Sequence, residues 1–356
     1  MVASPDRFLL SSFEILVNGT QVPVEVESHI NIVMVDDNID MPGMFLFELT
    51  DSDAQEGETP LIDDLDLFSL GNVVEVKMGY ADELETLIIG EITGLEPEFV
   101  LDGLPVLTVR GYDRSHHLLR GRKTRTFVEQ KDSEIVEKIA SEAGLTAEVE
   151  DSEVLHPYVV QANQTDMAFL QDRAKRIQYE VVIEDKTLFF RPVSNAESEV
   201  VTLEMNDDLT EFYPRLSSVP QVSEVSIRGW DPKEKKEIVG QASIGDEVST
   251  MDGQDSGAAL TDAAFGVAIG AVTERPVMTQ AEADQLAKAK FNNTVLSLIQ
   301  GEGSCLGRTD LRSGKVIKIE GIGERFSGSY YIASVIHRYS PQDGYFSNFT
   351  VRRNAS

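Results

Sequence analysis

The chain has one cysteine, few basic residues and no long apolar run, and each shortage excludes a class of protein. With Cys305 alone, no internal disulfide forms, and we expect this thiol to be a small buried hydrophobe. No run approaches the ~18 apolar residues that a membrane-spanning helix needs. The N-terminal stretch does not read as a signal peptide, because Asp6, Arg7 and Glu14 interrupt its apolar positions. We therefore expect synthesis and folding in the cytosol, without direct membrane insertion.

Basic residues are scarce: 31 Lys and Arg face 61 Asp and Glu, for a net charge of -30. Phosphate backbones would be repelled, so we expect no nucleic-acid partner. Residues 31–70 contain eleven acidic residues and no Lys or Arg. We interpret these acids as parts of solvated loops; alternatively, they line the lumen of an assembly. Calcium binding is the sharper alternative, but the D-x-[DN]-x-[DN]-G loop is missing.

Motifs of catalysis are missing too. The chain has no G-x-S-x-G, HExxH, CxxC or Gly-rich phosphate loop, and its five histidines are scattered. Paired carboxylates such as Asp36 and Asp37 are too common in so acidic a chain to mark a glycosidase. We expect no enzyme: no catalytic residues, no cofactor and no metal. His337 is expected to be packed within a strand.

One sequence pattern occurs twice. Leu107–Asp113 reads LTVRGYD, and Val225–Asp231 reads VSIRGWD. Alternation with period 2 predicts a half-buried strand, the Gly allows a sharp turn, and the Asp can hydrogen-bond that turn. We interpret the two copies as one β unit used twice.

The segments around these copies predict three domains. Residues 1–112 form a first tube-like β domain, with six or seven short strands in a closed or nearly closed antiparallel barrel or sandwich. Residues 113–195 form a small α+β insertion module, and residues 196–356 form a second tube-like β domain. The fold class is thus mainly β, with two tube-like antiparallel β-barrel domains and a small α/β module. The strands expected in the first domain are Phe13–Val17, Val22–Val26, Ile30–Val35, Met44–Leu49, Val73–Met78, Leu87–Ile92 and Val106–Arg110.

Helical periods begin in the module. Asp132 is expected to cap one helix that ends at Gly144, and Thr165 begins a second, with Asp166 in its first turn. Strands Tyr179–Glu184 and Thr187–Arg191 follow as a hairpin. In the last domain, a capping box at Thr279 predicts a helix to about Asn293. Residues 252–271 are interpreted as a mobile loop, or alternatively as a buried Gly-containing segment at an assembly contact. The expected final strands are Ser297–Ser304, Val316–Glu320, Tyr330–Tyr339 and Tyr345–Arg352.

A basic segment opens the module. Arg110–Arg125 contains six basic residues and one acid, Asp113. It is either a solvated connector that neutralises acidic loops or an inter-subunit contact. The interface candidates are Arg114, Arg120, Arg122, Lys123 and Arg125. His116 and His117 are adjacent, but neighbours on a strand point to opposite faces and no third ligand with suitable spacing follows, so we expect no metal there.

Three blocks carry a family resemblance: VRGYDRSHHLLRGRKTRTF from Val109, NQTDMAFLQDRAKRIQYEVVIEDKTLFF from Asn163, and the G-x-Y-x-I-x-x-V-x-H-x-Y-S pattern of Gly328–Ser340. Together they resemble the phage late control D proteins, which are similar to the hub part of VgrG and to the central hub of contractile phage tails. The resemblance extends from about Phe13 to Arg353.

The resemblance implies a structural baseplate hub of a contractile injection system or phage tail-like particle. Such a hub is a homotrimer whose six β units form a ring, and it links a trimeric spike to the hexameric inner tube and initiates tube assembly. The implied partners are an inner tube protein, a separate spike protein, and baseplate and tube-adaptor proteins. The protein would be made in the bacterial cytoplasm and incorporated into the particle. The alternative is a β-rich glycan- or receptor-binding adhesin, which would expose clustered aromatics, whereas Trp230 and most Tyr and Phe residues fall inside alternating strands.

Overall fold

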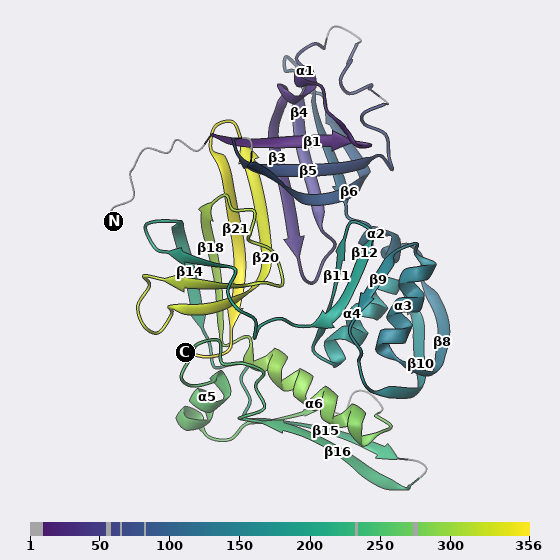
Figure 1. Ribbon diagram of the computed structural model, residues 1–356, viewed down its shortest axis with the longest axis vertical. Coiled ribbons are helices and arrows are strands. Elements are labelled where there is room, and N and C mark those ends of the chain that lie inside the picture. Colours follow the sequence, from purple (N-terminus) through teal and green to yellow (C-terminus); the bar gives the residue numbers. More distant parts are fainter. Residues whose placement is uncertain (1–9, 55–57, 65, 82, 232–233, 273–276) are drawn as a thin grey trace.

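The computed structural model describes residues 10–54, 58–64, 66–81, 83–231, 234–272 and 277–356. The predicted mainly-β fold with large antiparallel sheets is confirmed (Figure 1). The closed barrels are not: in the described part of the chain, thirteen strands form one open sheet. No helix in these ranges is long and apolar enough to cross a membrane. Asp6, Arg7 and Glu56, which entered the sequence argument, lie outside the described residues.

The first β unit consists of seven strands and one short helix around an apolar core. Its strands alternate, so Val74, Val76 and Met78 of one strand all face that core. The expected strand Val22–Val26 is wrong, because Pro23 begins a one-turn helix there. The elements are β1 (Ser11–Val17), β2 (Thr20–Gln21), α1 (Val24–Glu27), β3 (Ile30–Asn38), β4 (Met44–Thr50), β5 (Val73–Tyr80), β6 (Glu83–Glu98) and β7 (Val106–Tyr112).

The α/β module follows and has a core of its own. A helix begins at Thr165 as predicted, and Thr165 is its cap, since its hydroxyl accepts the Ala168 N–H. The cap assigned to Asp132 is wrong: Lys131 holds the cap position, and the Asp132 carboxylate binds Arg173 instead. The elements are α2 (Ser115–Leu119), β8 (Lys123–Lys131), α3 (Asp132–Glu142), β9 (Thr146–Val149), β10 (Leu155–Gln164), α4 (Asp166–Arg176), β11 (Tyr179–Glu184) and β12 (Thr187–Pro192).

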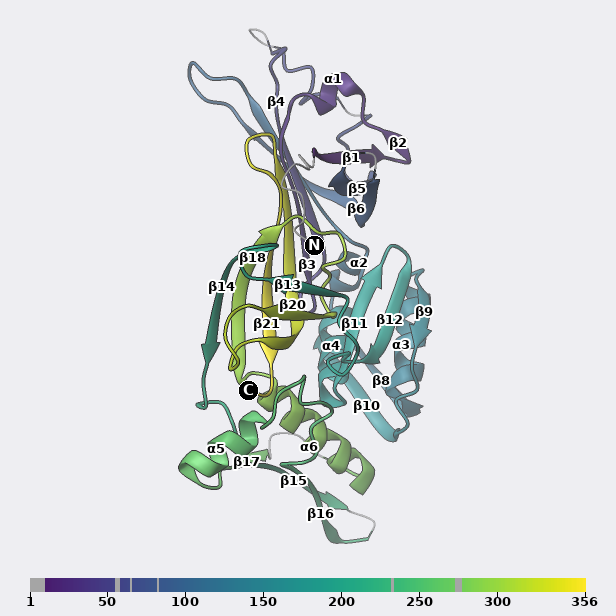
Figure 2. The same cartoon turned by 60° about the vertical axis from the view of Figure 1, so that its left-hand side comes forward.

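The second β unit is assembled from two separated segments of the chain, and its core is again separate. Its strands are β13 (Val201–Glu204), β14 (Leu209–Leu216), β18 (Ile299–Leu306), β19 (Val316–Glu320), β20 (Gly328–Ser340) and β21 (Gly344–Arg353). Between β14 and β18 the chain leaves the sheet to form a smaller lobe, which we call the second insertion (Figure 2).

The second insertion is a three-stranded sheet covered by α6. The expected loop over residues 252–271 is wrong, because Ser256 caps a helix there by accepting the Ala259 N–H. The helix begun by Thr279 is confirmed, with the Thr279 hydroxyl accepting the Glu282 N–H. The elements are β15 (Glu224–Asp231), β16 (Lys236–Ser243), α5 (Gly257–Phe265), β17 (Ile269–Val272) and α6 (Gln280–Val295).

The repeated sequence pattern does not mark the repeated β unit. Its first copy forms β7 in the first β unit, but its second copy forms β15 in the second insertion. The Gly of each copy lies within its strand and not at a turn. Gly111 is required because the Phe45 ring lies against it. The expectation for the Asp holds, since Asp113 accepts the Ser115 N–H and Asp231 the Glu234 N–H.

A different duplication is present in the topology. Apart from the two-residue strand β2, the first unit has the strand order β3-β4-β7-β6-β5-β1, and the second has β14-β18-β21-β20-β19-β13. Each unit thus arranges six strands in the sequence 2-3-6-5-4-1. Two register shifts also coincide, whereas the shift between Val76 and Lys77 in the β5–β6 pair has no counterpart between β19 and β20. One lies between Ile30 and Ile32 and its counterpart between Leu209 and Glu211. A second pair of register shifts lies between Ile92 and Gly94 in β6 and between Ile332 and Ser334 in β20. One difference is that β13 pairs parallel with β19, whereas β1 pairs antiparallel with β5.

Candidate assembly surface

The two β units are joined within the chain by one strand pair. β20 of the second unit pairs antiparallel with β3 of the first, from Ser334 opposite Asn38 to Tyr339 opposite Val33. The other edge of β20 pairs with β21, so the sheet continues without interruption from one unit to the next (Figure 1). The structure therefore shows how one β unit attaches to another of the same topology.

Polar contacts fix this junction. Ser313 donates its N–H and its hydroxyl to the carboxylate of Asp37, at 2.9 and 2.6 Å. Arg312 donates to the backbone carbonyls of Thr86 and Leu87, at 2.5 and 2.6 Å. The β18–β19 connection of the second unit is thereby held to β3 and β6 of the first.

Carboxyl groups crowd a cleft beside the junction. Asp36, Asp37, Asp113 and Asp185 line it together with Arg312. Burial, and then the charge of Asp37, raises the pKa of Asp36 above its ordinary value. Burial also raises the pKa of Asp113, although hydrogen bonds from Ser115 and Gly43 oppose the shift. The cleft is a polar seam between the domains, and its carboxyls support backbone groups such as the Gly43 N–H.

The duplicated topology identifies two strand edges as counterparts of the β3–β20 junction. In β6, pairing with β5 ends at Glu91, so the edge facing away from β7 has no partner in the described residues from Gly94 to Glu98. β14 is the terminal strand of the sheet and pairs only with β18 along Glu211–Leu216. Unpaired edges expose backbone N–H and C=O groups and invite pairing with another chain.

Apolar and charged side chains accompany these edges. Tyr213 on β14 is 66% exposed, and Phe99, directly after β6, is 64% exposed. Glu96 on β6 lies 3.3 Å from the Arg110 guanidinium. Arg215 on β14 is exposed, and no side chain among the described residues pairs with its guanidinium. Each edge thus carries an apolar group, and Glu96 and Arg215 have opposite charges, beside the further acids Glu98 on β6 and Glu211 on β14.

Most side chains of the predicted basic interface form ion pairs or hydrogen bonds within the chain. Arg114 pairs with Glu91 and Asp185, and Arg122 donates to the Asn163 carbonyl. Lys123 and Arg125 both bind the Asp166 carboxylate, at 2.7 and 2.8 Å, and Arg125 also binds Glu142. Arg120 is exposed, and its side chain has no hydrogen-bond or ion-pair partner among the residues described. Docking by this segment stays a prediction that rests mainly on Arg120.

The two adjacent histidines are placed differently from the sequence prediction. They lie on helix α2 and not on a strand, so their rings do not point to opposite faces. Both Nε2 atoms face the Glu91 carboxylate on β6, at 3.5 Å from His116 and 2.8 Å from His117. A third side chain of metal-ligand type is thus on an earlier strand, where local sequence gives no signal.

Other predicted residues are placed as follows. Cys305 and His337 are fully buried, as expected. Trp230 lies within strand β15, as expected, and is 58% exposed, so it is not part of a core; an interface role stays a prediction. In the acidic segment, Asp51 accepts backbone N–H groups of Leu61 and Ile62. Within the described ranges these acids do not gather into a group of metal-ligand geometry.

Comparisons with known proteins agree on the fold. A 43 kDa tail protein of prophage MuSo2 from Shewanella oneidensis is similar, with a TM-score of 0.72, 15% identity and coverage of 96% of this chain and 98% of that one. A tail protein from Neisseria meningitidis MC58 is similar with a TM-score of 0.70 and 13% identity, and the match covers 96% of each chain. The E. coli protein c3393 is similar with a TM-score of 0.62 and 14% identity, and the match covers 96% of this chain and 77% of that one. It is a component of the type VI secretion system with structural similarity to the T4 bacteriophage tail proteins gp27 and gp5.

A search of curated proteins finds no match. These structures support the late control D resemblance only in the fold, which is that of tail proteins. The family whose sequence profile matches the chain is a different one. That profile, the Alg8 N-terminal domain, matches residues 8–341. Since the match spans most of the sequence, the chain belongs to the Alg8 N-terminal domain family.

Proposed function

We propose that the chain is the structural baseplate hub of a contractile, phage tail-like particle, and that it acts as a homotrimer. The observation that carries the proposal is the β unit present twice with one strand order and matching register shifts. Because the second unit attaches to the first through β20 and β3, the counterpart strands β6 and β14 are suited to join neighbouring copies. Three copies would then form a ring of six similar units.

The register of this contact follows from the matching register shifts. The extra residue at each register shift aligns the two units: Thr93 corresponds to Ala333, and Asn31 to Thr210. With this alignment, the six residue pairs of the β3–β20 junction give six residue pairs between β6 and β14. They place Gly94 of one copy opposite Ser217 of the next, and Phe99 opposite Phe212. In between, Leu95 faces Leu216, Glu96 faces Arg215, Pro97 faces Pro214 and Glu98 faces Tyr213.

The side chains of this register are complementary. Glu96 and Arg215 have opposite charges, and directly opposed pairs of this kind stabilise a sheet by roughly 0.2–1 kcal/mol. Leu95 and Leu216 would bury each other. Two prolines lack N–H donors, but residues of one antiparallel rung direct their N–H groups either both inward or both outward. Placing Pro97 opposite Pro214 therefore confines the missing donors to one rung.

A ring of six similar β units suits the role of a hub. It would match a hexameric inner tube on one side and a trimeric spike on the other, initiate tube polymerisation and transmit thrust to the spike. The partners are then an inner tube protein, a separate spike protein, and baseplate and tube-adaptor proteins. The similarity of the fold to two tail proteins, and to a type VI secretion component that is structurally similar to gp27 and gp5, supports this proposal. The absence of catalysis is part of it.

Mass measurement in solution tests the proposal. Light scattering on the purified chain should give three times the 39.3 kDa chain mass, alone or when co-expressed with tube and spike proteins. Arg215→Glu places two acids opposite each other and should shift the equilibrium toward monomers. Lys290→Glu, a charge reversal on α6 away from both edges, is the matched control. A chain that stays monomeric with its partners and binds sugars would instead support the adhesin alternative.

A further inference from the structure

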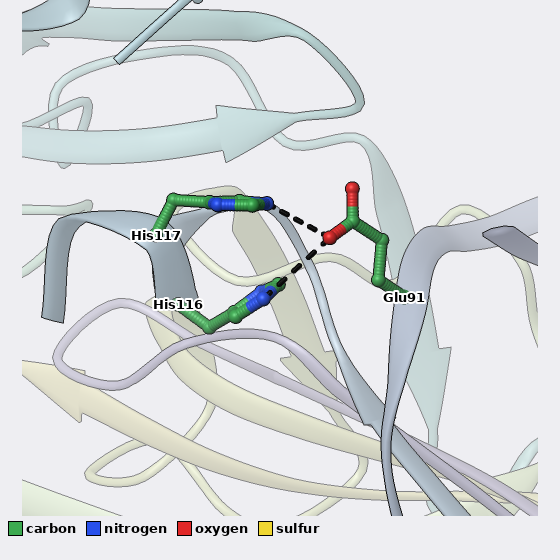
Figure 3. A group of neighbouring side chains, drawn as sticks. All are labelled: Glu91, His116 and His117. Carbon is green, nitrogen blue, oxygen red and sulfur yellow. Dashed lines mark hydrogen bonds and ion pairs between the residues drawn. The ribbon is translucent and has the colours of Figure 1, made fainter. Parts of the chain in front are cut away.

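Three side chains with metal-ligand chemistry converge where the first β unit meets the α/β module. Glu91 comes from β6, and His116 and His117 come from α2 (Figure 3). One ligand atom from each lies within 4.8 Å of the other two. Glu91 and His116 are largely buried, with side chains 17% exposed, whereas His117 is 40% exposed. The group is therefore shielded by the fold but reachable from solvent.

The backbone partner of His116 selects the tautomer of its neutral ring. Its Nδ1 lies 2.9 Å from the Asp113 carbonyl oxygen, which can only accept, so Nδ1 carries the hydrogen. In the neutral ring, Nε2 then has a free lone pair, and it faces a Glu91 carboxylate oxygen at 3.5 Å. Two electron-rich atoms face each other, which a cation between them would stabilise. An imidazole whose other nitrogen binds a carbonyl is the usual arrangement of a metal-binding histidine.

The elements that carry these ligands are well supported. The Asp113 carboxylate accepts N–H groups from Gly43 and Ser115, both at 2.8 Å, which fixes the start of α2. Arg114 lies 3.4 Å from Oε1 of Glu91, whereas both histidines face Oε2. Arg114 also pairs with Asp185, so the cation that opposes metal binding is itself partly neutralised.

Distances and ligand types select the metal. Zinc–nitrogen and zinc–oxygen bonds of about 2.0–2.1 Å place tetrahedral ligands about 3.4 Å apart. The separation of 3.5 Å between Glu91 and His116 is close to this value, the 2.8 Å separation at His117 needs an opening, and the two imidazole nitrogens lie within 4.8 Å of each other. Two imidazoles and one carboxylate favour zinc over calcium or magnesium, which prefer oxygen ligands.

We propose that Glu91, His116 and His117 form a binding site for Zn²⁺ or a similar divalent transition metal, with a fourth position open to water. The metal joins β6 of the first β unit to the first helix of the α/β module. It thereby fixes the angle between these domains. This inference does not depend on the proposed hub function, since it needs only one chain.

Titration calorimetry on the full-length, chelator-treated chain tests the site with ZnCl₂ as the probe. We expect one zinc per chain, visible absorption bands on substitution with Co²⁺, and a melting temperature that rises with zinc. His117→Ala and Glu91→Gln should each weaken binding by about 100-fold or more, beyond the 10–100-fold typical of outer-shell changes.

His29→Ala is the matched control, because His29 is a half-buried histidine that is hydrogen-bonded to Ser52 and is not one of the three ligands. It should bind zinc like the wild type. Glu91→Gln keeps the shape of the side chain, so its melting temperature in chelator reports whether folding is intact. The proposal would be overturned if the wild type bound no zinc, or if His117→Ala and Glu91→Gln bound zinc as tightly as the wild type.

Discussion

Ser313 donates two hydrogen bonds to the carboxylate of Asp37, one from its backbone at 2.9 Å and one from its hydroxyl at 2.6 Å. The two residues are on different β units, so this contact holds together the junction on which the continuous sheet depends. Hydrogen bonds to a charged group contribute more than neutral ones, about 1.5–3 kcal/mol.

Asp37→Ala should therefore lower the free energy of unfolding by about 1–3 kcal/mol in chemical denaturation. Ser313→Ala removes only the hydroxyl bond and should cost less. The double variant should cost less than the sum of the two, because both changes remove the same contact. Strictly additive costs would show that Asp37 stabilises the chain through another contact.

Buried His337 should make stability depend on pH. Burial lowers its pKa to about 3, and its two ring nitrogens are satisfied in the neutral form by the Leu311 carbonyl and the Tyr345 hydroxyl. The unfolded chain takes up a proton near pH 6.5, whereas the folded chain does not. Stability should fall by about 1.4 kcal/mol per pH unit below about pH 6. His337→Gln should flatten this slope; an unchanged slope would assign the pH dependence to other groups.

A second acid-sensitive contact lies within the α/β module. Burial by itself raises the pKa of Asp132, but the hydrogen bond from His156 and the charge of Arg173 outweigh it, so the pKa is lowered. The stability contributed by this shift is present above about pH 3.9 and is lost as the pH falls further. Asp132→Asn leaves the Arg173 charge buried without its partner and should cost about 3–5 kcal/mol at neutral pH. A loss below 1 kcal/mol would contradict this account.

Within the basic segment, two arginines should behave differently. Arg125 binds Asp166, Gln161 and Glu142, so Arg125→Glu should lower the melting temperature of the chain. Arg120 is exposed, and Arg120→Glu should change stability by no more than about 0.5 kcal/mol. If the segment docks onto an acidic neighbour, Arg120→Glu should still impair particle assembly, scored by electron microscopy. Normal particles from this variant would remove docking from the account.

Local sequence predicted elements well where one physical signal dominated. Period-2 burial gave most strands of both β units, and side-chain caps gave α4 and α6. It failed where a longer-range partner decided the outcome. Asp132 has the composition of a cap, but a buried arginine 41 residues later claims its carboxylate. The Gly- and Ala-rich residues 252–271 lack strong periodicity, yet Ser256 provides a cap for α5.

Local sequence could not predict the candidate assembly surface for the same reason. β3 and β20 are about 300 residues apart, and no pattern in either strand specifies the other. The repeated LTVRGYD pattern suggested duplication for a wrong reason, since its second copy lies in the second insertion. Only strand order and register reveal the duplicated unit. Likewise, Glu91 joins His116 and His117 through tertiary structure alone.

The inter-subunit register can be measured by disulfide formation between Glu96→Cys and Arg215→Cys. Directly opposed residues of an antiparallel pair have Cα atoms about 4.5–5.5 Å apart, within the range of a disulfide. The native thiol should not interfere, because Cys305 is buried and burial raises its pKa to about 12. We predict covalent trimers after mild oxidation, none from either single variant, and far fewer from Glu96→Cys with Tyr213→Cys, which lies two residues along β14. Chains that remain unlinked, or that link better through Tyr213→Cys, would contradict the pairing of β6 with β14.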